Sequence, residues 1–401
     1  MGILIKNGRV IDPANGVDKI ADVLIESGKI AAFGQFDADG HNIIDAADMW
    51  VVPGFIDLHV HFREPGQTHK EDIATGSAAA ALGGFTTVCT MPNTNPAVDS
   101  PDGVDFQIRR GREIGLVDIL PVGAITQGLA GKELAPIAEL IAAGAVGISD
   151  DGYTVQNADL KRQAMEIAAK LGTAVFSHCE EEDEMIARDI KLAEETGVRL
   201  HICHVSTAVG VGLIRDAKAR GVAVTAEAAP HHFSLCNEDF DGQDTNFKMN
   251  PPLRGRKDMK AVLAGLADGT IDAIATDHAP HSADEKAVVF ADAPNGVVGL
   301  ETALAVAFTH LVKTGLMTPT GLVEKMAVLP AKILGINKGH LTVGAPADVT
   351  IIDPTANYSI NPANFGGKSK NTPFAGQNVQ GRVVHTIFGG KIVVKDGKLV
   401  D

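Results

Sequence analysis

Eight short apolar runs alternate with Ala-, Leu- and Glu-rich segments over residues 51–314 of this 401-residue sequence. Short apolar runs are typical of parallel strands that are buried on both faces. The runs are 51–60, 84–90, 116–122, 145–149, 173–178, 199–204, 222–228 and 271–276. Segments of helical composition include 131–143, 157–170, 181–195, 206–220, 257–268 and, after the last run, 299–314. This order predicts an α/β fold of the (β/α)8 TIM-barrel type.

The two ends of the chain follow a different pattern. Both consist of short β-like runs with turn pairs such as Asn7-Gly8, Ser27-Gly28 and Asp396-Gly397. Because these ends flank the predicted barrel, we expect them to form one small β-sandwich domain. We assign residues 1–50 and 341–401 to this domain and residues 51–340 to the barrel. A Pro-, Asn- and Gly-rich stretch, 354–380, is expected to be a long loop of the small domain.

Charge and cysteine usage narrow the range of partners and compartments. The net charge of −15 argues against nucleic acid or an anionic membrane as a partner, since both bind basic surfaces. We find no signal peptide, and no apolar run approaches the roughly 20 residues of a membrane span. The four cysteines form no C-x-x-C pair and are interpreted as reduced core residues. We therefore expect a cytoplasmic protein.

His59 and His61 lie at the end of the first apolar run, in the stretch VVPGFIDLHVHFREPG. Side chains alternate faces along a strand, so the two imidazoles should point the same way. If the chain stays extended for two more residues, Arg63 joins that face as an anion-binding group. The pair alone fits half a metal site as well as it fits two half-exposed histidines. The other strand ends must decide between these readings.

Further histidines and acids fall at or just after the ends of other predicted strands. Active sites of barrel enzymes are built at the carboxyl ends of the strands. Besides the histidines of the first strand, these positions hold Asp150, Asp151, His178, His204 and Asp277. Imidazole and carboxylate ligands that converge on one point favour zinc or a similar metal. Any one of these residues could be a hydrogen-bonded core or rim group. It is much less probable that five strand ends all carry such a group by chance, so we predict a metal site.

Other polar residues receive a structural interpretation or stay open. His201 has the opposite parity to His204 and is expected to face the helices. His231 and His232 follow the seventh strand, and spacing alone does not exclude them as ligands. The acidic run 180–184 is interpreted as a solvated helix start, where carboxylates are favourable.

Seven motifs, in this order, resemble the bacterial class I dihydroorotases of the amidohydrolase superfamily. They are GFIDLHVHFREPG, TMPNTNP, ISDDG, SHCE, CHVST, KMNPPLR and TDHAPH, and the resemblance extends over essentially the whole chain. It implies reversible hydrolysis of (S)-dihydroorotate to N-carbamoyl-L-aspartate, in the de novo biosynthesis of UMP. It also implies one or two zinc ions, a homodimer and a complex with aspartate carbamoyltransferase.

The resemblance also implies the role of individual residues. It favours Asp151 over Asp150, and His204 over His231. The implied metal ligands are His59, His61, Asp151, His178, His204 and Asp277, with Asp277 as general acid and base. The implied substrate-binding residues are Arg63, Asn93, Asn250 and His281. Without the resemblance, Asn93 in Pro-Asn-Thr-Asn-Pro would be interpreted as a turn asparagine.

Three departures from the family pattern concern the site. Residues 141–152 contain no lysine, whereas many superfamily members bridge two metals with a carboxylated lysine there, so Asp151 must be the bridge. The segment 178–204 is shorter than in typical relatives, and Asn295-Gly296 stands where Phe-Gly is more frequent. Two alternatives remain: a cyclic amidase of the hydantoinase or allantoinase type, and a non-catalytic partner of aspartate carbamoyltransferase.

Overall fold

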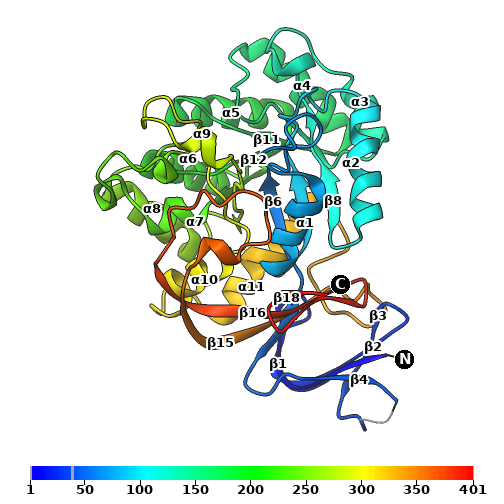
Figure 1. Cartoon of the computed structure of the whole chain (residues 1–401). Helices are drawn as coiled ribbons and strands as arrows, with labels where there is room; N and C mark the ends of the chain where they lie inside the picture. The colour runs from blue at the N-terminus through cyan, green and yellow to red at the C-terminus, as the bar shows by residue number, and fades with distance from the viewer. Residues whose placement is uncertain (1, 38–39, 401) are drawn as a thin grey trace.

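The computed structural model describes residues 2–37 and 40–400 (Figure 1). Two parallel sheets form its centre. One has the order β6(Phe55–Val60)-β7(Phe85–Thr90)-β8(Asp118–Pro121). The other runs β9(Gly123–Ala124)-β10(Gly147–Ser149)-β11(Ala174–Ser177)-β12(Arg199–Ile202)-β13(Val224–Ala228)-β14(Ala273–Ile274). The prediction of an α/β fold with parallel strands is therefore confirmed.

Short contacts join the two parallel sheets at both ends. Only Val122 separates β8 from β9, and its N–H donates to Thr90 of β7 at 2.9 Å. On the other side, Val60 of β6 forms a parallel bridge with His278, a few residues after β14. The N–H of His61 also donates to the carbonyl of His278 at 2.8 Å. The first strand of the chain's central part therefore lies beside the last.

Helices follow the central strands, as the alternating pattern predicts. The longer ones are α1(Ile73–Leu82), α2(Pro101–Ile114), α3(Ile137–Ala142), α4(Ala158–Leu171), α5(Glu182–Thr196), α6(Ala208–Ala219), α8(Arg256–Asp268) and α12(Leu329–Leu334). The shorter ones are α7(Pro230–Ser234), α9(Ala283–Lys286), α10(Ala303–Ala307) and α11(Pro319–Val323). No helix of the described ranges is long and apolar enough to cross a membrane.

Local chemistry moves some boundaries away from the predicted ones. The helix expected over 131–143 begins only at Ile137, because a proline at 136 favours the start of a helix over its interior. The strand expected over 51–60 is broken at Gly54 into β5(Trp50–Pro53) and β6. A Cβ on Gly54 would lie 2.3 Å from Thr86 Oγ1, so only glycine allows this close approach.

Both chain ends contribute to one nine-stranded sheet, which also includes β5. Its order is β18(Lys398–Leu399)-β17(Lys391–Lys395)-β16(Asn378–Phe388)-β15(Val349–Ser359)-β5-β1(Ile3–Asp12)-β2(Val17–Glu26)-β3(Lys29–Gly34), and β4(Asn42–Asp45) pairs with β1. Figure 1 shows these blue and red strands together below the central strands and their helices. The loop expected over 354–380 is shorter, because β15 extends to Ser359 and β16 begins at Asn378.

Buried apolar side chains form several clusters. One includes Ile56, Leu58 and Phe176 together with Ile333 of α12, and a separate one includes Ile5 and Val23 of the nine-stranded sheet. All four cysteines are buried free thiols, as the sequence predicts.

Candidate metal centre and substrate pocket

Asp151 lies at the centre of four imidazoles that come from three other strand ends. Its Oδ1 lies 3.2 Å from His59 Nε2 and 3.4 Å from His178 Nδ1. The same oxygen is 3.7 Å from His204 Nε2, and Oδ2 is 3.4 Å from His61 Nε2. All five side chains are buried. The structure thus brings together five of the six residues predicted as metal ligands.

Asp277, the sixth predicted ligand, lies on the side of the cluster formed by the first strand. Its Oδ1 is 3.2 Å from His61 Nε2 and 3.6 Å from His59 Nε2. Asp277 follows β14 and adopts a left-handed backbone with φ of 47°. Such a conformation is costly for a residue with a side chain and is concentrated at functional sites. It turns the carboxylate towards the histidines.

The two carboxylates are held in their charged forms. Burial opposes ionisation of Asp151, but His59, His178 and His204 keep its pKa well below the usual value. Burial likewise opposes ionisation of Asp277, and the bond from His61 together with the charges of nearby histidines lowers its pKa. Anionic oxygens among imidazoles are the donor set that a divalent first-row metal prefers.

Two of the three groups of potential metal donors in the described residues share Asp151. One is His59, His61 and Asp151, the other is Asp151, His178 and His204, and in each group the atoms lie within 4.8 Å of one another. His59 Nε2, Asp151 Oδ1 and His204 Nδ1 are buried and have no hydrogen-bond partner among the described residues. Buried polar atoms without a partner are costly in a folded protein. These residues therefore fit one or two metal ions.

Hydrogen bonds behind the first two histidines fix their orientation. His61 Nδ1 donates to Asn93 Oδ1 at 2.8 Å, and His59 Nδ1 donates to Glu227 Oε1 at 2.8 Å. Both bonds leave Nε2 free to face the cluster. Such partners select the tautomer of metal-binding histidines and raise their basicity. Asn93 therefore has a contact that the sequence interpretation did not include.

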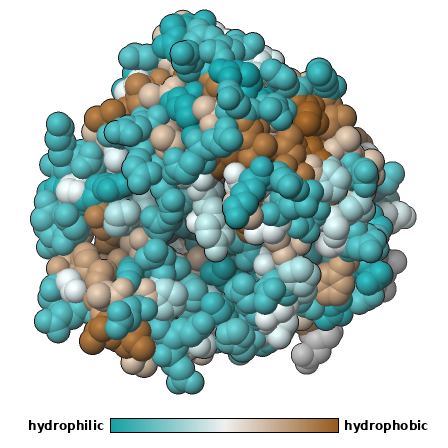
Figure 2. Space-filling view, turned by 90° about the horizontal axis from the view of Figure 1, so that it is seen from above, coloured by the Kyte–Doolittle hydropathy of each residue, from teal (hydrophilic) through white to brown (hydrophobic). Residues whose placement is uncertain are grey.

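A cavity of about 200 Å³ opens beside the cluster. It is lined by all four predicted substrate-binding residues, Arg63, Asn93, Asn250 and His281, together with five of the predicted ligands. Asn250 Nδ2 lies 3.3 Å from His178 Nε2, at the border between cluster and cavity. Figure 2 shows the molecule from above, the side towards which the arrow of β6 points, and this face is mostly hydrophilic.

Arg63 supplies a positive charge to the lining of this cavity. Its Nε donates to the carbonyl of Pro280 at 3.2 Å, and no carboxylate of the described ranges lies within 4.0 Å of its guanidinium. Burial lowers its pKa to about 10, so it stays cationic at neutral pH. The side chain is only 8% exposed. A buried, unpaired guanidinium is a strong site for an anionic ligand.

His281 lies next to Arg63 and is neutral. Its Nε2 donates to the carbonyl of Asn295 at 2.8 Å, and Arg63 Nη2 is 3.5 Å away. Burial and the charges of Arg63 and Lys70 lower the pKa of His281 to about 3. At neutral pH its imidazole is therefore uncharged, with its single N–H directed at Asn295 and Nδ1 left as an acceptor, 3.5 Å from Lys70 Nζ.

The comparisons with known proteins identify the family. The model of the amidohydrolase family matches residues 50–393. The chain belongs to the amidohydrolase family. It is 50% identical to a dihydroorotase of Pelotomaculum thermopropionicum, over 99% of each chain, and 48% identical to one of Geotalea daltonii, over 98% of this chain and 100% of the relative.

Solved structures of hydantoinases share the fold. An L-hydantoinase (dihydropyrimidinase) from Arthrobacter aurescens aligns with a TM-score of 0.89 and 27% identity, over 100% of this chain and 97% of the other. A D-hydantoinase (dihydropyrimidinase) from a Thermus species aligns with a TM-score of 0.85 and 27% identity, over 99% and 96%. This likeness extends through both the parallel strands and the nine-stranded sheet.

In this amidohydrolase the neighbouring acids Asp150 and Asp151 have different surroundings. Asp150 turns away from the cluster, and its Oδ1 accepts bonds from the N–H groups of Ile125 and Thr126 at 2.8 and 2.9 Å. Its other oxygen accepts a bond from the Thr126 hydroxyl. Asp150 therefore holds the loop after β9, while Asp151 faces the histidines.

The prediction that His201 faces the helices is wrong. His201 Nε2 donates to Glu227 Oε2 at 3.0 Å, and the same carboxylate binds His59, so His201 lies inside the parallel strands below the cluster. The argument from parity fails because β12 ends at Ile202 and His204 takes a positive φ of 33°. Alternation of faces holds only while the chain stays extended. Sequence reasoning missed Glu227. Its only signal in the sequence is that it is a lone acid in an apolar run.

The two histidines left open by spacing lie apart from the two donor groups. His232 Nε2 donates to the carbonyl of Pro251 at 2.9 Å. His231 is buried, which lowers its pKa to about 4, and the donor groups of the described residues do not include it.

The acidic run 180–184 is not a uniformly solvated helix start. Glu182 is buried, and its Oε1 accepts a bond from the N–H of Ser206 at 2.7 Å. Arg254 Nη2 lies 3.5 Å from its other oxygen. Glu182 thus joins α5 to the loop before α6, two residues after His204. The helix composition gave no sign of this contact across the chain.

Proposed function

We propose that this amidohydrolase is a class I dihydroorotase, which hydrolyses (S)-dihydroorotate reversibly to N-carbamoyl-L-aspartate in the de novo biosynthesis of UMP. The observation that carries the proposal is a buried cationic Arg63, without a carboxylate partner among the described residues, in one cavity with five of the six predicted metal ligands. A cyclic amide that bears a carboxylate needs both features. Curated relatives named dihydroorotase, at 46–50% identity over nearly the whole chain, support the same reading.

Zinc is the proposed metal, with one or two ions. His59, His61 and Asp277 would hold one, His178 and His204 the other, and Asp151 would contact both. When bound, such a metal lowers the pKa of water to about 7 and polarises the scissile carbonyl. Without a lysine in residues 141–152, Asp151 is the one shared donor that the cluster offers.

Asp277 is the proposed general acid and base. Its carboxylate is ionised and 3.2 Å from His61 Nε2, so it can accept a proton at the cluster. It then gives this proton to the ring nitrogen that leaves when the amide C–N bond breaks. The reverse reaction uses the same group, because ring closure removes a proton from that nitrogen.

The substrate carboxylate is proposed to bind the other side of the cavity. Arg63 offers a planar fork of donors, and Asn93, Asn250 and His281 offer further polar groups around it. This arrangement holds the ring with its amide carbonyl towards the cluster. Enclosing the charges in a small, buried cavity also strengthens each interaction.

Two finer structural statements belong to this proposal. We propose that the central strands close into a (β/α)8 barrel over residues 51–340, supported by the Val60–His278 bridge. The ends, 1–50 and 341–401, would then form the β-sandwich domain. Assembly into a homodimer, or with aspartate carbamoyltransferase, stays a prediction from the resemblance.

A hydantoinase-type cyclic amidase is the second candidate, because the solved structures of that name align with TM-scores up to 0.89. The absent lysine and the unpaired Arg63 favour dihydroorotate over a ring without a carboxylate. A non-catalytic role is disfavoured, since all six predicted ligands lie together.

The test is turnover by the purified, zinc-loaded protein of dihydroorotate beside hydantoin and allantoin, with zinc measured by elemental analysis. We expect zinc to be bound and dihydroorotate to be the preferred substrate. Preference for hydantoin or allantoin would contradict the proposal, and so would a zinc-loaded protein that hydrolyses none of the three.

A further inference from the structure

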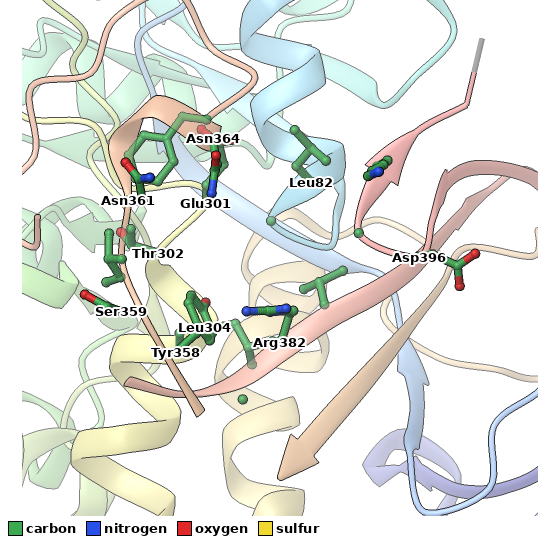
Figure 3. Close-up of a pocket in the computed structure, with 18 residues that line it drawn as sticks. Leu82, Glu301, Thr302, Leu304, Tyr358, Ser359, Asn361, Asn364, Arg382 and Asp396 are labelled. Atoms are coloured by element: carbon green, nitrogen blue, oxygen red, sulfur yellow. The ribbon is translucent and has the colours of Figure 1, made fainter. Parts of the chain in front are cut away.

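Residues 365–371 form a segment between β15 and β16 that crosses from the nine-stranded sheet to the substrate cavity. We call it the strap. It begins beside Glu301, whose Oε1 accepts a bond from the N–H of Gly366 at 2.6 Å. Figure 3 shows Glu301 next to Asn361 and Asn364, just before the strap, at the edge of a larger cavity of about 540 Å³.

The middle of the strap is fixed to the loop that precedes α1. The N–H of Lys368 donates to Glu71 Oε1 at 3.1 Å, and Ser369 Oγ donates to the carbonyl of Lys70 at 2.7 Å. The Lys368 ammonium also donates to the carbonyl of Thr68 at 2.7 Å. These contacts tie the strap to the chain shortly after Arg63 without using its last residue.

Asn371 ends the strap and bonds to both loops that form one wall of the substrate cavity. Its Oδ1 accepts a bond from the N–H of His281 at 3.2 Å. Its Nδ2 donates to the carbonyl of Gly296 at 3.0 Å and lies 3.4 Å from that of Ala279. Its own carbonyl accepts a bond from the N–H of Val298 at 2.9 Å. The side chain is buried and 5% exposed.

The two loops have little freedom to pack differently. Gly296 has a φ of 134°, and a Cβ there would lie 2.7 Å from Ala279. Segments 279–281 and 295–298 therefore pack closely, and the side-chain amide of Asn371 bonds to both of them. Ala279, His281 and Gly296 line the cavity beside the cluster, whereas Asn371 does not. Its influence on a ligand would pass through His281 and the cavity wall.

We propose that Asn371 is a positioning residue that sets His281 and the Gly296 wall for recognition of the substrate carboxylate. This inference rests on the proposed function and adds to it a part of the cavity that the small β-domain supplies. Asn371 does not itself line the substrate cavity, and its side chain bonds to no member of the donor cluster. Its loss should weaken carboxylate binding and leave metal content and the chemical step nearly intact. The other strap contacts remain, so the fold should persist.

The experiment compares Asn371→Ala and Asn371→Asp with the wild type in the zinc-loaded, full-length protein. The alanine removes all side-chain bonds, whereas the aspartate keeps the acceptor for His281 and loses both donors. Asn364→Ala is the matched control, since this exposed residue lies just before the strap and outside the substrate cavity. The readouts are KM and kcat for dihydroorotate, the Kd of orotate, zinc content and thermal melting.

We expect KM and the orotate Kd to rise about tenfold in both variants, which corresponds to the loss of one to two buried hydrogen bonds. We expect kcat to stay within about threefold and zinc content to be unchanged. In a His281→Ala background, Asn371→Ala should change KM by less than about twofold, because the imidazole that Asn371 positions is already absent although the backbone N–H remains.

Three outcomes would overturn the inference: wild-type KM in both Asn371 variants, a fall in kcat or zinc with KM unchanged, or failure of both variants to fold. Additive effects in the His281→Ala background would exclude action through His281. A wild-type protein that ignores dihydroorotate while binding zinc would instead refute the proposed function, so the two failures are distinguishable.

Discussion

Glu227 binds His59 and His201 through its two oxygens, at 2.8 and 3.0 Å. Burial opposes ionisation of this carboxylate, but its two histidine partners lower its pKa to about 2. A charged acceptor behind His59 keeps the proton on Nδ1 and leaves Nε2 for the cluster. Glu227 thus connects the interior of the parallel strands to the candidate metal centre.

Replacing this acceptor should weaken metal binding. We expect Glu227→Gln to raise the Kd for zinc roughly 10- to 100-fold, the usual effect of losing such a partner. A competition titration with a zinc chelator measures this Kd. Glu166→Gln, on the exposed side of α4, is the matched control. An unchanged Kd in the Glu227 variant would mean that His59 needs no partner to face the metal.

Arg63→Lys keeps a positive charge but removes the planar fork. We expect kcat/KM for dihydroorotate to fall roughly 10- to 100-fold, as for the loss of a charged hydrogen bond, with zinc content unchanged. The exposed Arg109→Lys on α2 serves as control. Parent-level activity in the Arg63 variant would show that the substrate carboxylate binds elsewhere.

The two acids of the cluster should respond differently to the same change. Asp277→Asn keeps one oxygen ligand but cannot carry a proton, so most zinc should remain while activity collapses. Asp151→Asn removes charge from the donor shared by both groups, so zinc content should fall, and excess zinc should restore part of the activity. Zinc stoichiometry and zinc-supplemented turnover measure both. Rescue of the Asp277 variant alone would reverse the two assignments.

Glu301 predicts a pH dependence of stability. Burial raises its pKa from 4.5 to about 8, and the bond from Gly366 only partly offsets this. The folded protein therefore holds a proton that the unfolded chain has lost between these values, so Glu301 lowers stability progressively as the pH rises from about 4.5 to above 8. Glu301→Gln keeps an acceptor for Gly366 and does not titrate.

Thermal or urea unfolding of the wild type and Glu301→Gln at pH 5, 7 and 9 tests this dependence. We expect the variant to gain stability relative to the wild type as the pH rises. Parallel stability curves for the two proteins would contradict the raised pKa.

The sequence allowed the parallel α/β architecture to be predicted because its apolar runs are short and regularly spaced. It also indicated which residues follow the strands, and those residues meet in one place. Positive φ at Arg63, His204 and Asp277 could not be foreseen. These turns leave the extended chain, so the parity argument failed for His201, and Arg63 reaches the cavity through a turn instead of an extended strand.

The sequence pattern also could not predict contacts between residues that are far apart in the chain. Glu227 binds His59 across 168 positions, and Asn371 binds His281 across 90. Neither pair has a fixed spacing or a local signal, since only the packed strands and the path of the strap bring them together. Glu182 is a similar case, because its burial depends on Ser206 and Arg254 rather than on its helix.

The relative rate on dihydroorotate and on dihydrouracil, the same ring without the carboxylate, tests the central claim most directly. Sites built to bind a polar substrate group reject analogues that lack it, because their own buried groups are left unpaired. We therefore predict that the zinc-loaded wild type favours dihydroorotate in kcat/KM by at least about a thousandfold. Equal or faster hydrolysis of dihydrouracil would contradict the account, because the buried charge of Arg63 would then have no role in selecting the substrate.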